Sequence, residues 1–184
     1  MLANKQQIIK FILLAFSIYI LWFIIYDFVI EPDKRIDFGL NVLLANSGSF
    51  LLRLLGYTAD VSINGNKISM RINSTSLLDV GNACNGLELF VLFVGFIICF
   101  PSGKANKWWF IIAGILSIHL LNSIRAAALA LNQYYHPQSL HFNHHYTFTI
   151  IVYAYIFYLW ILWVNRFSKS KSMQKTTFPP HAKT

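Results

Sequence analysis

Charged side chains are scarce in this chain. Of its 184 residues, 12% are charged and 56% are hydrophobic, whereas an ordinary soluble domain has about 25% charged and about 45–50% apolar residues. Four membrane spans of roughly 20 residues each would use nearly half of the sequence. Little is left for a soluble catalytic domain, so any chemistry is expected in or beside the spans.

Cysteine is almost absent. The two cysteines, Cys84 and Cys99, are expected at opposite ends of one helix. At about 1.5 Å per residue they would lie roughly 22 Å apart, but the α-carbons of a disulfide lie within about 7 Å. A disulfide between them is therefore excluded. Cys84 is either a reactive lone thiol or a small packing residue between Ala83 and Gly86.

Common metal-binding motifs are also missing. Neither the C-x-x-C nor the H-E-x-x-H spacing occurs. A group of histidines, His136, His141, His144 and His145, could still bind zinc or copper together with Cys84. This metal-binding alternative has no motif to support it, and no cofactor is expected.

The charges that are present are unevenly distributed. All seven acidic residues lie between Asp27 and Glu88, and nine of the 15 basic residues lie in the N-terminus, the 101–107 loop and the C-terminal tail. The positive-inside rule places both termini and that loop in the cytoplasm. Because the basic residues follow the membrane edges, a nucleic-acid partner is not expected.

The hydrophobic pattern predicts an all-α polytopic membrane protein. About four transmembrane helices are expected, over residues 11–30, 80–100, 108–134 and 147–164. Residues 36–56 are apolar but interrupted by polar side chains, which predicts an interfacial or partly re-entrant helix. These segments make one integral membrane domain, 1–166, followed by a disordered basic cytoplasmic tail, 167–184.

Residues 57–75 have a different pattern, in which polar and apolar side chains alternate around Asn64-Gly65. That dipeptide tolerates the positive φ angles of a type I′ turn. A small extracytoplasmic β-hairpin is therefore expected at this position.

Three reactive side chains fall at the outer ends of three different predicted spans: Cys84, Arg125 and His144. An imidazole and a guanidinium beside a thiol favour its thiolate form. The imidazole can then act as base and acid, and the guanidinium can stabilise an oxyanion or orient a carbonyl group. This combination predicts cysteine acyl transfer at a membrane surface.

Arg125 lies in an apolar span, where an arginine costs about 2.5–3.5 kcal/mol to insert and usually faces a cavity or a partner. Asn122 and His119 share its helical face. Arg125 could instead extend toward the lipid headgroups, and His119 is expected to be a buried, hydrogen-bonded histidine. Glu88 either pairs with Arg125 or simply benefits from its position near a helix N-terminus.

The sequence also resembles the exosortase/archaeosortase family of membrane transpeptidases. Ala83-Cys84-Asn85-Gly86 resembles the A-C-x-G element of that family, Asn122-Ser123-Ile124-Arg125 resembles its N-x-x-R element, and a histidine begins the following span. The order of these elements and their expected outer placement agree as well. The resemblance covers about residues 82–158.

The resemblance implies an enzyme that cleaves C-terminal sorting signals, each made of a short motif, a transmembrane helix and a basic tail, from membrane-anchored precursor proteins. It implies that Cys84 is the nucleophile, that Arg125 positions the substrate or stabilises the transition state, and that His144 transfers protons. Asn122, Glu88, His145 and Gly86 would support the site. The implied location is the cell membrane, with the active site extracytoplasmic.

Two departures from the family pattern matter. The chain is shorter than the larger members, and Phe148 stands where a glycine often follows the histidine. Because His144 and His145 are adjacent, either could be the catalytic histidine. A non-enzymatic membrane subunit of an export or polysaccharide assembly remains the alternative function, and the sequence leaves the substrate, the acceptor nucleophile and the oligomeric state open.

Overall fold

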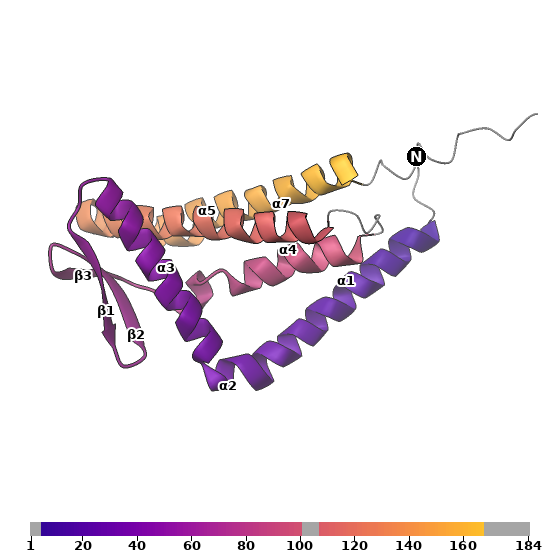
Figure 1. The fold of residues 1–184 in the computed structure, drawn as a ribbon, viewed down its shortest axis with the longest axis horizontal. Helices are drawn as coiled ribbons and strands as arrows, with labels where there is room; N and C mark the ends of the chain where they lie inside the picture. The colour runs from indigo at the N-terminus through magenta and orange to yellow at the C-terminus, as the bar shows by residue number, and fades with distance from the viewer. Residues whose placement is uncertain (1–4, 101–106, 168–184) are drawn as a thin grey trace, which may run out of the picture.

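The computed structural model describes residues 5–100 and 107–167, and within them the chain is mostly helical with one small sheet (Figure 1). Except for Phe167, which ends α7, the predicted tail at 167–184 lies outside the described residues, as does the 101–107 loop up to residue 106. The main elements are α1 (Lys5–Ile25), α2 (Glu31–Asp33), α3 (Arg35–Leu54), β1 (Ala59–Asn64), β2 (Lys67–Ile72), β3 (Thr75–Asp79), α4 (Leu87–Cys99), α5 (Lys107–Tyr135) and α7 (Phe148–Phe167).

Short turns connect these elements at the end of the bundle that carries the sheet, called the sheet end below. They are the π-helical turns η1 (Tyr26–Ile30) and η4 (Asn143–Thr147), the 3-10 turns η2 (Asn82–Cys84) and η3 (Pro137–Ser139), and the single helical turn α6 (Leu140–Phe142).

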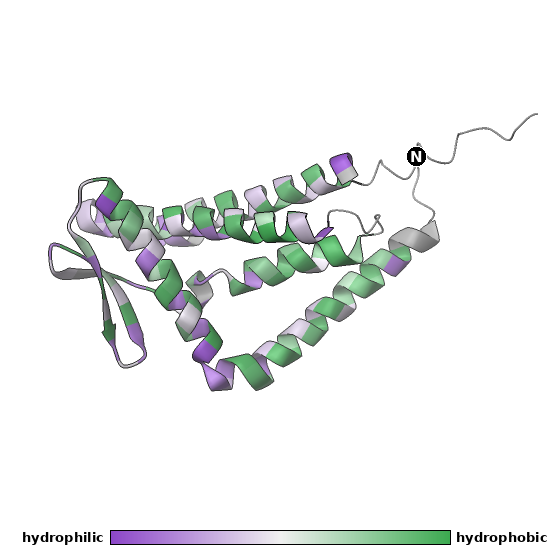
Figure 2. Ribbon diagram, in the orientation of Figure 1, coloured by the Kyte–Doolittle hydropathy of each residue, from purple (hydrophilic) through white to green (hydrophobic). Residues whose placement is uncertain are grey.

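Three helical segments are long and apolar enough to cross a membrane: Ile9–Asp33, Lys107–Tyr135 and Phe148–Arg166. They match the predicted first, third and fourth spans, and Figure 2 shows that hydrophobic residues dominate them. The second predicted span is different, because α4 has only 13 residues, which is roughly 20 Å of helix against a hydrocarbon core of about 30 Å. The count of four spans is therefore not confirmed.

The start predicted for that second span is wrong. Residues 80–86, expected to be helical, form a connection that contains η2, and α4 begins at Leu87. Gly86 marks the boundary, since its φ of +85° belongs to the left-handed region that glycine adopts at little cost. The misplaced boundary puts Cys84 in a loop before the helix.

The predicted hairpin is present but forms part of a three-stranded antiparallel sheet with the order β1-β2-β3. Its first turn is also not type I′, because only Gly65 of the central pair Gly65-Asn66 has a positive φ. The second turn does fit type I′, since Asn73 and Ser74 both have positive φ angles of 53° and 66°. Asn64, expected to lie in the turn, ends β1 instead.

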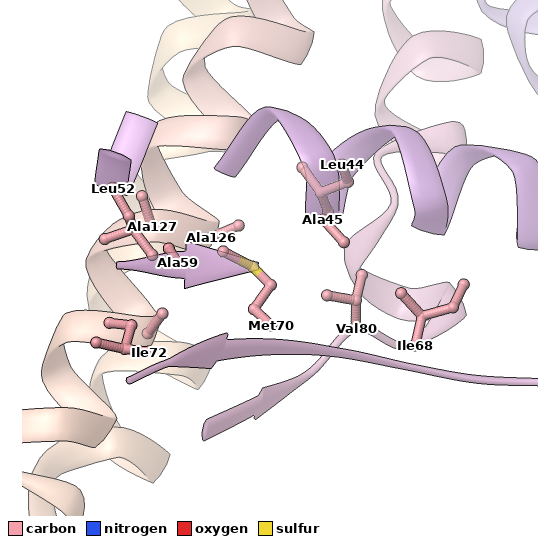
Figure 3. Packing of buried hydrophobic residues seen from close by; sticks show 11 residues of the cluster. Leu44, Ala45, Leu52, Ala59, Ile68, Met70, Ile72, Val80, Ala126 and Ala127 are labelled. Atoms are coloured by element: carbon pink, nitrogen blue, oxygen red, sulfur yellow. The ribbon is translucent and has the colours of Figure 1, made fainter. Parts of the chain in front are cut away.

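The predicted interfacial segment forms the helix α3, which connects the tip of the first span to the sheet (Figure 1). One face of α3 packs against α5 and the sheet to form a buried cluster, shown in Figure 3. Gly48 allows the close approach, because a Cβ at this position would lie 2.8 Å from the Met70 side chain. Cys84 packs against this cluster, so the packing of α3 on the sheet also fixes the loop that carries the thiol.

A second buried cluster holds α4, α5 and α7 together. The ring of Phe93 is fully buried and lies so close to Gly114 that a Cβ there would be 2.2 Å from it. A clash of this size forces α4 and α5 apart, so Gly114 is required for their packing. In contrast, no residue of the hydrophobic window of α1 is buried, and α1 diverges from the other helices toward the sheet end (Figure 1).

Candidate functional site

Cys84 ends the 3-10 turn η2, and two residues separate it from the start of α4 at Leu87. Its backbone N–H donates to the carbonyl of Gly81 at 2.9 Å, and its own carbonyl accepts a hydrogen bond of 2.7 Å from Nδ2 of Asn122. Asn122 is buried in α5. This hydrogen bond fixes the position of the Cys84 backbone relative to the helix that also carries Arg125.

Gly86 adds a second constraint at the same place. A Cβ there would lie 3.1 Å from Nδ2 of Asn122, so any larger residue would press on the amide that holds Cys84. The spacing of cysteine and glycine in A-C-x-G thus has a physical reason in this chain: the glycine makes room for the asparagine of N-x-x-R.

The start of the cysteine loop is held by the sheet. Asp79, the last residue of β3, accepts a 2.6 Å hydrogen bond from Ser69 and forms an ion pair with Lys67. The Ser69 hydroxyl and the Lys67 ammonium hold the pKa of Asp79 below its ordinary value. Asn41 of α3 then donates to Oδ1 of Asn82 at 2.8 Å. The loop is therefore tied to β2 and to α3 before it reaches the thiol.

His144 contacts Cys84 from the turn that precedes α7. Its Nε2 lies 3.2 Å from Sγ of Cys84, and both side chains are half-buried. His144 lies in the π-helical turn η4, and its carbonyl accepts a hydrogen bond from Thr149. Wide turns of this kind often occur at functional sites, because they redirect side chains within a helix.

The second histidine, His145, has its side chain outside the described residues, so its position is not compared with that of His144. Among the residues that the structure describes, no group of three or more His, Cys, Asp or Glu side chains could hold a metal ion. The metal-binding alternative gains no support from this part of the chain.

Arg125 is half-buried in α5, and its Nε is buried without a hydrogen-bond partner in the described structure. Ion pairing between Arg125 and Glu88 was one of two expectations for Glu88, but no such pair is formed. Both residues instead line one cavity of about 430 Å³. His119, on the same face of α5, forms a 3.2 Å hydrogen bond with Ser47.

Arg125 borders both that cavity and the space around the thiol. It lines the large cavity at the sheet end and also a small hollow of about 20 Å³ that is shared by Cys84, His144 and Asn122. The large cavity opens between α1, α4 and α7 and contains the carboxylates of Asp27 and Glu88. The structure thus places the three candidate catalytic side chains around the small hollow, and Arg125 also lines the larger cavity next to it.

One buried residue of the site has no counterpart in the sequence prediction. Asp37 of α3 is 1% exposed and accepts hydrogen bonds from Nδ2 of Asn85 at 2.6 Å and from the hydroxyl of Tyr26 at 3.2 Å. Oδ1 of Asn85 in turn accepts the N–H of Leu87 at 2.9 Å, at the start of α4. Asp37 therefore joins α1, α3 and the residue after Cys84. The signal in the sequence is a single acid in an otherwise apolar segment.

Asp37→Ala is expected to lower the free energy of unfolding by about 1–3 kcal/mol, because it leaves the buried amide of Asn85 without its acceptor. Thermal unfolding of the purified protein in detergent micelles measures the change. The matched control is Asp33→Ala, which removes an exposed carboxylate near the same helix junction. Equal unfolding temperatures for the two variants would show that the Asp37 hydrogen bonds contribute nothing.

Taken together, the fold and the site define a polytopic membrane protein with a thiol and an imidazole in contact at one end of its helical bundle. The family model for transmembrane exosortases matches residues 8–173, which is most of the chain. The chain therefore belongs to the transmembrane exosortase family. Neither the curated proteins nor the solved structures contain a significant match to the chain.

Proposed function

We propose that this protein is a membrane-embedded cysteine transpeptidase or protease that cleaves C-terminal sorting signals from membrane-anchored precursor proteins. The observation that carries the proposal is the 3.2 Å distance between Sγ of Cys84 and Nε2 of His144. A nucleophile within hydrogen-bond reach of a base is the arrangement required for covalent catalysis. Membership of the exosortase family supports the same reaction class.

In the proposed reaction, Nε2 of His144 accepts the thiol proton and the Cys84 thiolate attacks the carbonyl carbon of the peptide bond. The oxyanion that forms carries negative charge, which the guanidinium of Arg125 at the edge of the same hollow stabilises. His144 then donates its proton to the departing amine. The C–N bond breaks, and the precursor is left joined to Cys84 as a thioester.

An amine or a water molecule attacks this thioester in the second half of the reaction. His144 accepts the proton of the attacking group, and the Cys84 thiolate leaves and is reprotonated. An amine acceptor gives transfer of the precursor, whereas water gives hydrolysis. Asn122 and Gly86 position the nucleophile, and Glu88 lies at the rim of the cavity where substrate would enter.

The proposed orientation follows from the charges. Both termini and the 101–107 loop are basic and are placed in the cytoplasm. The sheet end, with Cys84, Arg125 and His144, then lies on the extracytoplasmic side of the cell membrane. A precursor would be cut just outside the lipid.

The proposed mechanism predicts a covalent intermediate. In membranes that contain the protein and its precursors, we expect a covalent adduct between the two. Neutral hydroxylamine should release the precursor from this adduct, because hydroxylamine cleaves thioesters. The adduct is expected in the Cys99→Ala variant and not in Cys84→Ala, and denaturing gels followed by mass spectrometry of the released chain detect it. An adduct that forms equally in Cys84→Ala would rule out this nucleophile.

A further inference from the structure

An apolar groove runs along the membrane-spanning part of the bundle, between α1, α4 and α7. Its volume is about 110 Å³, and it is lined mainly by aliphatic and aromatic side chains, among them Ile18, Trp22, Leu92, Gly95 and Trp160. Among the described residues that line the groove, Glu88 is the one acidic residue, and it lies at the N-terminal end of α4. We call this space the lateral groove.

The lateral groove continues into the candidate catalytic cavity. Tyr19, Trp22 and Glu88 line both spaces. The cavity then extends past Gly86 to Arg125, and Arg125 lines the hollow that contains Cys84. The apolar groove therefore adjoins a cavity with polar and charged lining, and that cavity shares Arg125 with the hollow that contains the reacting thiol.

A second opening widens the groove on the side of α7. A shallow hollow of about 510 Å³ is lined by Leu92 and Trp160, which also line the lateral groove, and by Thr149 and Tyr153, which also line the cavity. The groove is thus accessible from the side rather than closed by neighbouring helices. A long apolar segment could enter it sideways from the bilayer.

We infer that one face of the precursor's transmembrane helix packs on the lateral groove while the adjoining peptide lies in the cavity that Arg125 lines. This inference rests on the proposed function. The continuity of the groove with the cavity carries it: Gly95 is seven residues, or about 10 Å of helix, from Glu88, so a helix in the groove would emerge at the site. A bond just outside that helix would then reach the thiol.

Two further observations fit a helix as the occupant. Gly95 and Ala15 give the groove a shallow wall, and small residues of this kind allow close packing of helices in membranes. A Cβ at Gly95 would make an ordinary van der Waals contact with Ile18 of α1, at 3.6 Å, so a larger side chain at this position would extend into the groove. In addition, α1 is held against α4 near its start by Phe11, which packs on Phe96 and Phe100, while no residue of its hydrophobic window is buried within the described chain.

Photo-crosslinking tests this inference directly. The photoreactive residue p-benzoylphenylalanine replaces Leu92 in a Cys84→Ala background, so that precursor is bound but not cleaved. The control places it at Leu120, which is 56% exposed on α5 and lines neither the groove nor the cavity. Irradiation of whole cells is expected to join position 92, and not position 120, to the transmembrane segment of the protein that accumulates uncleaved in Cys84→Ala cells.

The outcomes separate the inference from the function on which it rests. If no membrane protein accumulates uncleaved in Cys84→Ala cells, the proposed function fails and the inference fails with it. If a precursor accumulates but position 92 crosslinks only to lipid or to a second copy of this chain, the groove proposal alone is overturned. The same holds if position 92 crosslinks to the precursor no more efficiently than position 120 does.

A groove-filling variant gives a second readout. Gly95→Leu fills the groove and is expected to slow cleavage of the same accumulated precursor on the order of tenfold, which corresponds to about 1.4 kcal/mol. Ala113→Leu, on an exposed face of α5, is the matched control and is expected to leave the rate unchanged. Thermal unfolding of both variants excludes misfolding as the cause, and an unchanged rate in a folded Gly95→Leu protein would contradict the inference.

Discussion

Cys84→Ala is expected to reduce precursor cleavage to the background rate, and Cys99→Ala is expected to leave it unchanged. The two cysteines differ in position, since Cys84 contacts His144 whereas Cys99 is buried at the other end of α4. Removal of a nucleophile removes the covalent pathway entirely, because no neighbouring group can form the thioester. The measurement is the ratio of uncleaved to cleaved precursor on immunoblots of membranes from cells that express each variant.

Cys84→Ser is a useful intermediate case. A serine hydroxyl occupies nearly the same space but is a weaker nucleophile than a thiolate at neutral pH. Cleavage is expected to fall nearly as far as in Cys84→Ala, while expression and unfolding temperature stay normal. Cleavage at the unmodified rate in Cys84→Ala would instead leave Cys84 as a packing residue beside the α3 and sheet cluster and would favour a non-enzymatic subunit.

Much of the membrane architecture could be predicted from the sequence, because long apolar runs have few alternatives to a helix in lipid. The runs that became α1, α5 and α7 had this property. The start of the helix in segment 80–100 was predicted too early, because several of the first residues of the segment are also apolar or small. Its true boundary depends on the left-handed Gly86 and on the hydrogen bond between Asn122 and Cys84, which involves residues 38 positions apart.

The strands were harder to predict than the helices. The alternation at 57–75 indicated a hairpin, but β3 at Thr75–Asp79 was hidden because it precedes an apolar segment without a break. Its pairing with β2 depends on the Asn73-Ser74 turn, in which both residues have positive φ angles. Such angles are uncommon outside glycine, so the composition of this turn gave a weak signal.

The candidate site combines residues that the sequence singled out with others that it could not. Cys84, Arg125 and His144 were expected together because charge placed all three at one side of the membrane. The role of Asp37 was not foreseen, since its partners Tyr26 and Asn85 lie 11 and 48 residues away. Long-range hydrogen bonds of this kind depend on tertiary packing, which single-sequence patterns do not encode.

The lateral groove could not be predicted from the sequence either. Residues such as Trp22, Leu92 and Trp160 are typical of any membrane helix. Their arrangement as the wall of a groove follows from the divergence of α1 from α4 and α7 toward the sheet end (Figure 1). That divergence depends on the turn through η1 and α2, where Lys34 adopts a positive φ of 58° and redirects the chain into α3.

His144→Ala is expected to slow precursor cleavage by about 10²–10⁴-fold, the usual contribution of a positioned general base and acid. Its Nε2 lies 3.2 Å from the thiol, within reach of the proton that must be removed before attack. His145→Ala is the matched control, because it removes the same functional group from the adjacent position. A loss confined to His144→Ala would assign the proton transfer to this residue.

The residual activity of His144→Ala provides the sharper test. The substitution leaves space where the ring had been, so free imidazole added to membranes is expected to restore part of the rate, while it should do nothing for Cys84→Ala. Rescue would separate a chemical role for His144 from a purely structural one, since a distorted site is not repaired by a soluble base. If instead His145→Ala shows the larger loss and the imidazole rescue, the catalytic histidine is His145, and the Cys84–His144 contact serves only to hold the π-helical turn against the cysteine loop.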